Sequence, residues 1–262
     1  MRPYFELMKR SFLGRRAYKL ELLLGVLTSF ASVFVVVALW RALYAAGGEP
    51  RGISLSAVTT YAVVSMGMRT AFMMNEFTLE RKVLTGEIVV DLLRPISIPL
   101  SLLSSTVANS AFNLIGQAVP TFVIAVILFH IPLPRTLLAG TLFLASVVLG
   151  FLLLFSFSLN FWALTFWLER TYSVITIKNS LVALTSGLLL PLWFVPKELI
   201  GLFNTLPFQY VYFAPISLYL GRLSPSMAIH AFVLQIVWLA VFSTSAWLIW
   251  KAGVKNLIVN GG

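Results

Sequence analysis

Long uncharged apolar runs constrain this chain more than any other feature. Residues 22–40 contain no charged side chain, and neither does the segment from Pro95 to Pro134. A helix of about 20 apolar residues spans the hydrocarbon core of a bilayer. Hydrophobic residues make up 59% of the chain and charged residues 11%, whereas a soluble domain carries about 25% charge. The chain therefore lacks the polar surface of a water-soluble fold, and its apolar runs predict membrane-spanning helices.

We predict an all-α polytopic membrane protein with one transmembrane domain over residues 1–262. It has about six spans, each an apolar run that ends at charged residues, prolines or glycines. The predicted spans cover residues 22–44, 53–74, 100–129, 137–167, 180–196 and 227–250.

The uncharged stretch 199–221 is long enough to cross the membrane, but Asn204, Pro207, Gln209 and Pro215 interrupt it. Crossing there would place the C-terminal lysines outside, against the positive-inside rule. We therefore predict short re-entrant helices at the outer face, where broken backbone is tolerated when protein surrounds it.

The N-terminal segment, residues 1–21, is basic and amphipathic. Phe5, Met8, Phe12 and Leu13 fall on one helical face, and Lys and Arg residues lie between them. This pattern predicts a helix on the inner membrane surface. With both termini in the cytoplasm, most Lys and Arg lie inside, as the positive-inside rule requires. The net charge of +10 then indicates contact with anionic membrane lipids, not with nucleic acid.

A densely charged segment, residues 76–95, separates the second and third spans. Glu80, Glu87 and Asp91 are spaced to share one face of a helix, and Leu79, Val83 and Val90 are spaced to share another. Gly86 is predicted to bend the segment, and Arg94-Pro95 to end it. Two interpretations stay open: a solvated helix on the membrane surface, or a docking helix for a cytoplasmic partner.

Polar residues recur inside the third span. Thr106, Asn109, Asn113 and Gln117 form a stripe at helical spacing. The stripe either joins neighbouring helices by hydrogen bonds or lines a translocation path. Ser156, Ser158 and Asn160 of the fourth span are expected to pair with it.

Arg69 is the one ionisable residue placed well inside a predicted span. Glu76 follows it at a distance of two helical turns. We expect the two side chains to pair, which makes a structural role more probable than contact with a substrate.

Catalytic signatures are absent from the sequence. It contains no phosphate-binding loop of the form G-x-x-x-x-G-K-[ST], no H-E-x-x-H and no G-x-S-x-G. It has no cysteine, and its two histidines, His130 and His230, are far apart. We predict no catalytic residue, no metal site and no cofactor bound by this chain.

Several motifs together resemble one family. The run from Gly86 to Leu92-Leu93-Arg94-Pro95 resembles the cytoplasmic motif of type-2 ATP-binding-cassette exporter permeases, in the subgroup of daunorubicin and viologen exporters. The stretch Leu190–Pro196, then Leu206-Pro207-Phe208 and Tyr212-Phe213-Ala214-Pro215, resembles the signature before that family's last span.

The resemblance implies a division of labour in the inner membrane of a prokaryote. This chain would be one permease half, paired with a second copy or with a related permease. ATP and Mg would bind a separate ATPase subunit, which docks on a coupling helix at 76–95. The docking residues would be Glu80, Arg81, Lys82, Gly86, Glu87, Asp91 and Arg94. The re-entrant helices at 197–221, with Pro196, Pro207, Phe208 and Pro215, would cap the pathway.

The apolar spans suit an amphipathic or lipid-like substrate or drug, and no charged residue specifies a charged cargo. Arg69, Asn109, Asn113, Gln117 and Asn160 are candidates for the pathway or for helix interfaces. An alternative function is a membrane scaffold or assembly factor that docks a partner and transports nothing. A further alternative is a channel that works without ATP.

Overall fold

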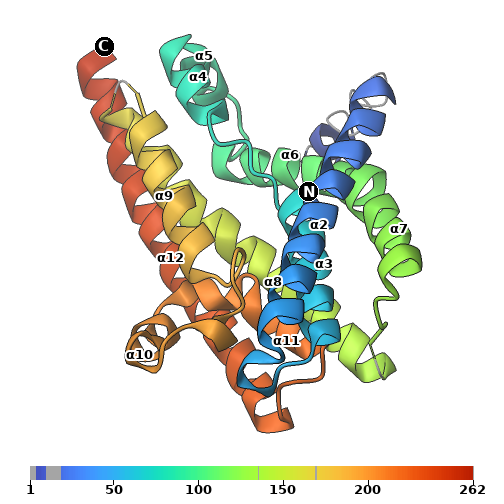
Figure 1. Ribbon diagram of the computed structural model, residues 1–262. Coiled ribbons are helices and arrows are strands. Elements are labelled where there is room, and N and C mark those ends of the chain that lie inside the picture. Colours follow the sequence, from blue (N-terminus) through green and yellow to red (C-terminus); the bar gives the residue numbers. More distant parts are fainter. Residues whose placement is uncertain (1–3, 10–18, 135, 169, 262) are drawn as a thin grey trace.

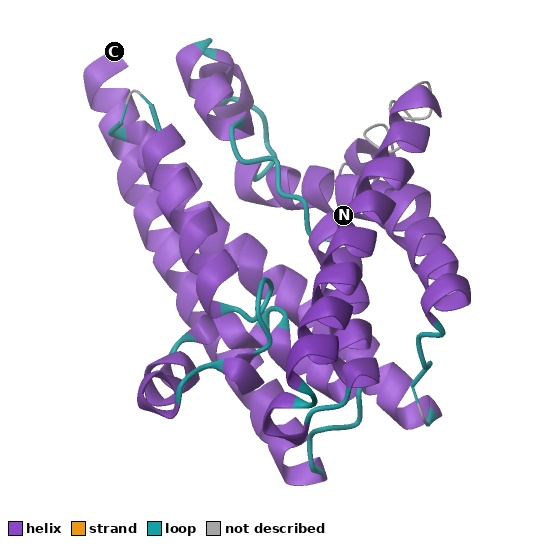
Figure 2. Cartoon of the chain, viewed as in Figure 1, coloured by secondary structure: helices purple, strands orange, loops and turns teal. Residues whose placement is uncertain are grey.

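The computed structural model describes residues 4–9, 19–134, 136–168 and 170–261, and every regular element in these ranges is a helix. Figures 1 and 2 show a bundle with no strand among the described residues. The all-α prediction is confirmed. Of the predicted N-terminal amphipathic helix, residues 4–9 are helical, whereas 1–3 and 10–18 lie outside the described residues.

Four helical runs in the described part of the chain are long and apolar enough to cross a membrane: 22–47, 98–129, 137–166 and 225–256. They coincide with the first, third, fourth and last predicted spans. The chain is thus a multi-pass membrane protein. The elements concerned are α2 (Lys19–Gly47), α6 (Ile98–Asn113), η3 (Leu114–Ala118), α7 (Val119–Phe129), α8 (Leu137–Trp162), η4 (Ala163–Phe166) and α12 (Pro225–Gly261).

The other two predicted spans contain shorter helices. Helix α3 (Leu55–Ala71) lies within predicted span 53–74. Helix α9 (Tyr172–Thr185) both begins and ends earlier than predicted span 180–196. The helix stops there because Gly187 adopts φ +85, a left-handed conformation that favours glycine. A Cβ on Gly187 would also lie 2.6 Å from the hydroxyl of Tyr61.

Short helices occupy the two ends of the bundle. Figure 1 shows α4 (Thr78–Leu84) and α5 (Glu87–Leu92) at the same end as the C-terminus of α12. The turn η2 (Pro50–Gly52) follows α2. After α9 come η5 (Leu192–Phe194), α10 (Lys197–Thr205), η6 (Pro207–Tyr210) and α11 (Phe213–Tyr219). Helices α10 and α11 lie toward the opposite end of the bundle.

The three prolines and one phenylalanine of the predicted cap lie in this second group of helices or next to it. Pro207, Phe208 and Pro215 are buried, whereas Pro196 is exposed and immediately precedes α10. The Phe208 ring packs edge-on against Phe157 of α8, with centroids 4.9 Å apart. The interrupted backbone of η6 and α11 is therefore enclosed by protein, as irregular structure at membrane depth requires, whereas α10 has no buried residue.

Helix α8 is central to the packing and contacts α12, α11 and η4. Gln235 of α12 is fully buried, and its amide nitrogen donates to the carbonyls of Ser146 and Tyr210, each at 2.9 Å. Asn160 donates to the Phe242 carbonyl at 3.1 Å and accepts from the Ser245 hydroxyl at 2.7 Å. The bond to Tyr210 joins α12 to η6, and the others join α8 to α12, as polar residues do between membrane helices.

The expected partners of the fourth-span polar residues were wrong. Ser156 pairs with Ser243 of α12 at 3.1 Å, and Ser158 accepts a bond from Lys178 of α9 at 2.9 Å. The third-span stripe lies elsewhere, with Thr106, Asn109 and Asn113 buried and Gln117 half-buried. Sequence spacing shows which residues share a helix face but not which helix that face meets.

Gly150 permits the closest approach of α8 to the short helices. A Cβ at this position would lie 2.9 Å from the carbonyl oxygen of Val211 and 3.3 Å from that of Tyr210. Both atoms belong to the main chain, which cannot move aside as a side chain can. We expect Gly150→Ala to lower the free energy of unfolding by about 1–3 kcal/mol.

Thermal unfolding in detergent measures this effect. Gly67→Ala in α3 is the matched control, because nothing lies within 4 Å of the added Cβ there. Helical propensity alone favours alanine over glycine. An equal melting temperature for both variants would contradict the close approach at Gly150.

Candidate functional site

The charged segment folds as a helical hairpin, α4 and α5, joined at Thr85 and Gly86. Gly86 has φ +76, so the helix cannot continue through it. The predicted sharing of one face by Glu80, Glu87 and Asp91 is therefore wrong, because it required a continuous helix. The predicted bend at Gly86 is present, and it sends the three carboxylates into three different surroundings.

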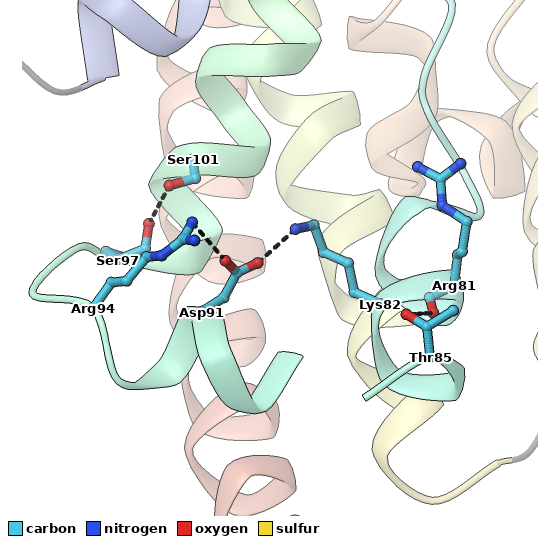
Figure 3. A network of polar contacts seen from close by, with 7 residues as sticks. All are labelled: Arg81, Lys82, Thr85, Asp91, Arg94, Ser97 and Ser101. Carbon is cyan, nitrogen blue, oxygen red and sulfur yellow. Dashed lines mark hydrogen bonds and ion pairs between the residues drawn. The ribbon is translucent and has the colours of Figure 1, made fainter. Parts of the chain in front are cut away.

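Asp91 holds the two arms of the hairpin together. Its carboxylate accepts from Lys82 Nζ of α4 at 2.5 Å and from Arg94 at 3.1 Å. Figure 3 shows Asp91 between these two cations, while Arg81 points away from them. The Asp91 side chain is 14% exposed, so most of it lies inside the hairpin. Asp91, Lys82 and Arg94 thus maintain the shape of the segment.

Glu80 fixes the hairpin to the chain that leads into α9. Its Oε2 accepts from the Thr171 amide at 2.8 Å and from the Thr171 hydroxyl, and Arg170 lies 3.7 Å from Oε1. The hydrogen bond from the Thr171 hydroxyl is the main cause that lowers the pKa of Glu80. Burial acts to raise this pKa, whereas the Thr171 amide and Arg170 lower it further. The side chain is buried, so Glu80 anchors the hairpin from within.

A second anchor lies below the hairpin and was not predicted. Glu76 accepts from Lys178 Nζ at 2.6 Å and from the Trp162 indole at 2.8 Å. Lys178 also donates to the Ser158 hydroxyl, and its side chain is 0% exposed. The predicted pairing of Glu76 with Arg69 is wrong, because α3 ends before Glu76 and the carboxylate turns toward α9. The only sequence signal was that Lys178 is the sole charge between Arg170 and Lys197.

The inner face of the hairpin is apolar. Leu79 and Ile88 are fully buried, and Val83 and Leu92 pack against the same cluster. That cluster continues into α6, α8, η4 and α12 through Ile98, Leu159, Trp162, Phe166 and Ala246. The hairpin therefore rests on the bundle over its whole length.

The outer face of the hairpin is also apolar but is uncovered. Leu84, Val89 and Val90 are about half exposed, and Leu93 is 82% exposed. Arg81 and Glu87 are exposed beside them. We call these six residues the outer hairpin face. The predicted apolar face of Leu79, Val83 and Val90 is thus divided, since two of its members point inward and only Val90 belongs to the outer face.

The remaining candidates lie apart from the hairpin. Asn160 belongs to the contact of α8 with α12, and Asn109 and Asn113 are buried in α6. Gln117 lies against α2, where a Cβ on Gly25 would come within 2.5 Å of its side chain. Arg69, at the end of α3, is exposed and lines two cavities. Among the described residues, no three His, Cys, Asp or Glu side chains are close enough together to hold a metal.

The described residues form an apolar helical bundle with a helical hairpin at one end, and four large apolar side chains of this hairpin are exposed. The sequence model described as "ABC-2 family transporter protein" matches residues 30–261. The chain belongs to this family and is a membrane permease component of a transporter. No curated protein and no solved structure matches the chain.

The Glu80 anchor predicts a pH dependence. Because its pKa in the folded protein lies below the ordinary value of 4.5, the ionised form stabilises the anchor fully at pH values above about 4.5. This contribution is lost as the pH falls through the lower folded-state pKa. The hydrogen-exchange protection factors of residues 78–92, which are corrected for the intrinsic pH dependence of exchange, should fall over that range, and Glu80→Gln should remove the step. An unchanged step in Glu80→Gln would assign it to another carboxylate.

The buried ion pair predicts a large effect of removing one partner. Lys178→Met leaves the Glu76 carboxylate largely buried without its cation, which costs about 3–5 kcal/mol. Combining it with Glu76→Gln should restore part of the loss, because no uncompensated charge then remains. Chemical unfolding of both variants measures this, with Lys82→Met as a half-exposed control that should cost about 1 kcal/mol or less. Equal effects of Lys178→Met and Lys82→Met would contradict the assignment.

Proposed function

We propose that this chain is the transmembrane permease half of an ATP-driven exporter, and that a separate ATPase subunit docks on the outer hairpin face. One observation carries the proposal. Four large apolar side chains are exposed on a hairpin whose other face is anchored to the bundle. An exposed apolar patch flanked by charged side chains is typical of a protein interface.

The absence of a phosphate-binding loop from the sequence supports a separate source of ATP hydrolysis. ATP and Mg would then bind the partner, and this chain would contribute no catalytic residue. Membership of the ABC-2 family supports the same division between permease and ATPase.

The anchors make the hairpin suitable for transmitting a displacement. Glu80 binds Thr171, next to the start of α9, and Glu76 binds Lys178 within α9. The ring of Phe77 also stacks on Tyr172 with centroids 6.0 Å apart. A partner that moves the hairpin therefore moves α9 with it, because three contacts join the two within a few turns.

The arrangement in the membrane follows from the charges. We infer that the hairpin and both termini lie in the cytoplasm of a prokaryote and that α10 and α11 lie toward the outer face, because most Lys and Arg are then inside. Large apolar side chains are exposed along α2 and α9. They leave surface for lipid and for a second permease, either an identical copy or a related chain.

The substrate proposed is an amphipathic or lipid-like molecule or drug, moved outward. The cavities of the bundle are lined mainly by apolar side chains. The cavity between α3 and α9 also contains three charged side chains, Arg69, Glu76 and Lys178. The resemblance of the hairpin motif to those of daunorubicin and viologen exporters supports export as the direction.

Charges placed on the outer hairpin face test the docking. Val90→Asp and Leu93→Asp should each abolish co-purification of the ATPase and substrate-stimulated ATP hydrolysis, because a carboxylate would be buried against the partner. Both positions are exposed, so the permease should keep its melting temperature. Lys255→Glu, exposed on the neighbouring end of α12, is the control and should leave docking unchanged.

Two outcomes of these experiments would contradict the proposal. If both hairpin variants retain the ATPase and its stimulation, the outer hairpin face is not the docking surface. If the ATPase binds but substrate never stimulates hydrolysis, the scaffold function is the better explanation.

A further inference from the structure

Arg69 lies where two cavities of the bundle meet. The first, of about 200 Å³, lies between α2, α3 and the junction of η3 with α7. Its hydroxyl residues are Thr28, Ser29, Ser32, Thr70 and Thr121. The second, of about 520 Å³, lies between α3 and α9 and is lined by Phe72, Met74, Leu188 and Tyr212 among others. Arg69 and Met73 line both, so the guanidinium can reach a ligand in either cavity.

No described residue compensates the positive charge of Arg69. Arg69 makes no ion pair or hydrogen bond with any residue that the structure describes. The one carboxylate in the wall of the larger cavity, Glu76, is already bound by Lys178 and Trp162. The described residues that line the two cavities therefore carry one net positive charge, which comes from Arg69.

A second polar group in the smaller cavity also lacks a partner. The Thr121 hydroxyl is buried, with the residue 4% exposed, and no described residue bonds to it. Buried hydroxyls are normally hydrogen-bonded. The π-helical turn η3 ends at Ala118, one turn before Thr121 of α7, and such turns are frequent at functional sites. Arg69 and Thr121 are thus two unused donors that line one cavity.

The surrounding surface suits an alkyl chain. Met66 and Met73 line the cavity that holds Arg69, and Met73 and Met74 line the larger one. Methionine side chains are flexible and adapt to apolar groups of different shape. A charged head and an apolar tail could therefore be bound together.

We propose that Arg69 binds the anionic head group of an amphiphile, with the Thr121 hydroxyl as a second donor and the methionine-lined cavities holding its tail. The proposal rests on the proposed permease function and narrows its substrate class from amphipathic molecules to anionic ones. Guanidinium favours phosphate, sulfate or carboxylate because its planar donors match two oxygens at once. The same chemistry fits an anionic membrane lipid and a free alkyl anion.

The test measures lipid binding to the purified full-length chain by native mass spectrometry. Dioleoyl phosphatidylglycerol is the anionic probe, and dioleoyl phosphatidylcholine is the zwitterionic one. The wild-type chain should prefer the anionic lipid, and Arg69→Gln should weaken that binding roughly tenfold, the loss expected for one charge-assisted hydrogen bond. Binding of the zwitterionic lipid should not change.

Three further variants make the result specific. Arg69→Lys keeps the charge and should retain most of the binding, whereas Thr121→Val removes the hydroxyl at nearly constant size and should weaken it several-fold. Arg41→Gln removes an exposed arginine on α2 that faces the Phe129 ring and should have no effect. An equal loss in Arg41→Gln and Arg69→Gln would overturn the proposal, because it would reflect net charge alone.

Competition identifies the source of the ligand. Displacement of phosphatidylglycerol by dodecyl phosphate, but not by inorganic phosphate, supports a site for free amphiphiles, and no displacement by either supports a membrane lipid. Unchanged binding in Arg69→Gln, or no preference for the anionic lipid in the wild type, overturns the proposal. The assay needs no ATPase, so failure of the docking proposed above would leave its result intact.

Discussion

The ion pair between Glu76 and Lys178 is the contact on which the rest of the structure depends. Lys178 has no exposed side-chain surface, and the indole of Trp162 and the hydroxyl of Ser158 complete the bonding of the two charges. A buried pair of this kind is stable only as a unit, because a single partner would be left charged and desolvated. It fixes the connection after α3 to both α8 and α9, directly beneath the hairpin.

This joint explains why the hairpin and the far end of the bundle are mechanically related. Helix α9 is held by Glu76 and Glu80 at one end, and at the other end the Tyr61 hydroxyl of α3 donates to the Gly187 carbonyl at 2.6 Å. Beyond Gly187, the guanidinium of Arg51 donates to the carbonyls of Trp193 and Val195. Each contact is short, and a displacement at the hairpin must therefore be passed along α9 or break one of these bonds.

The sequence predicted the helical class, the four longest apolar helices and the position of the charged segment, because these features depend on local composition. It did not predict the surroundings of Glu80 or Lys178. Thr171 and Lys178 lie about a hundred positions from their partners in the chain, and periodicity contains no information about contacts at that range. Residue spacing also failed to predict which hairpin side chains share a face. Gly86 ends the helical periodicity, so residues in α4 and α5 do not lie on one continuous helix.

The same limit explains the misassignment of Arg69. A spacing of two turns pairs it with Glu76 only if one helix contains both, and α3 ends at Ala71. Past that point the chain turns, and the carboxylate finds a lysine and an indole instead. An arginine at the end of an apolar helix is favoured by the helix dipole, but the dipole does not neutralise a charge that faces a cavity. The network that satisfies Glu76 so completely is therefore what leaves Arg69 available, so that the scaffold and the proposed specificity arise from one arrangement of charges.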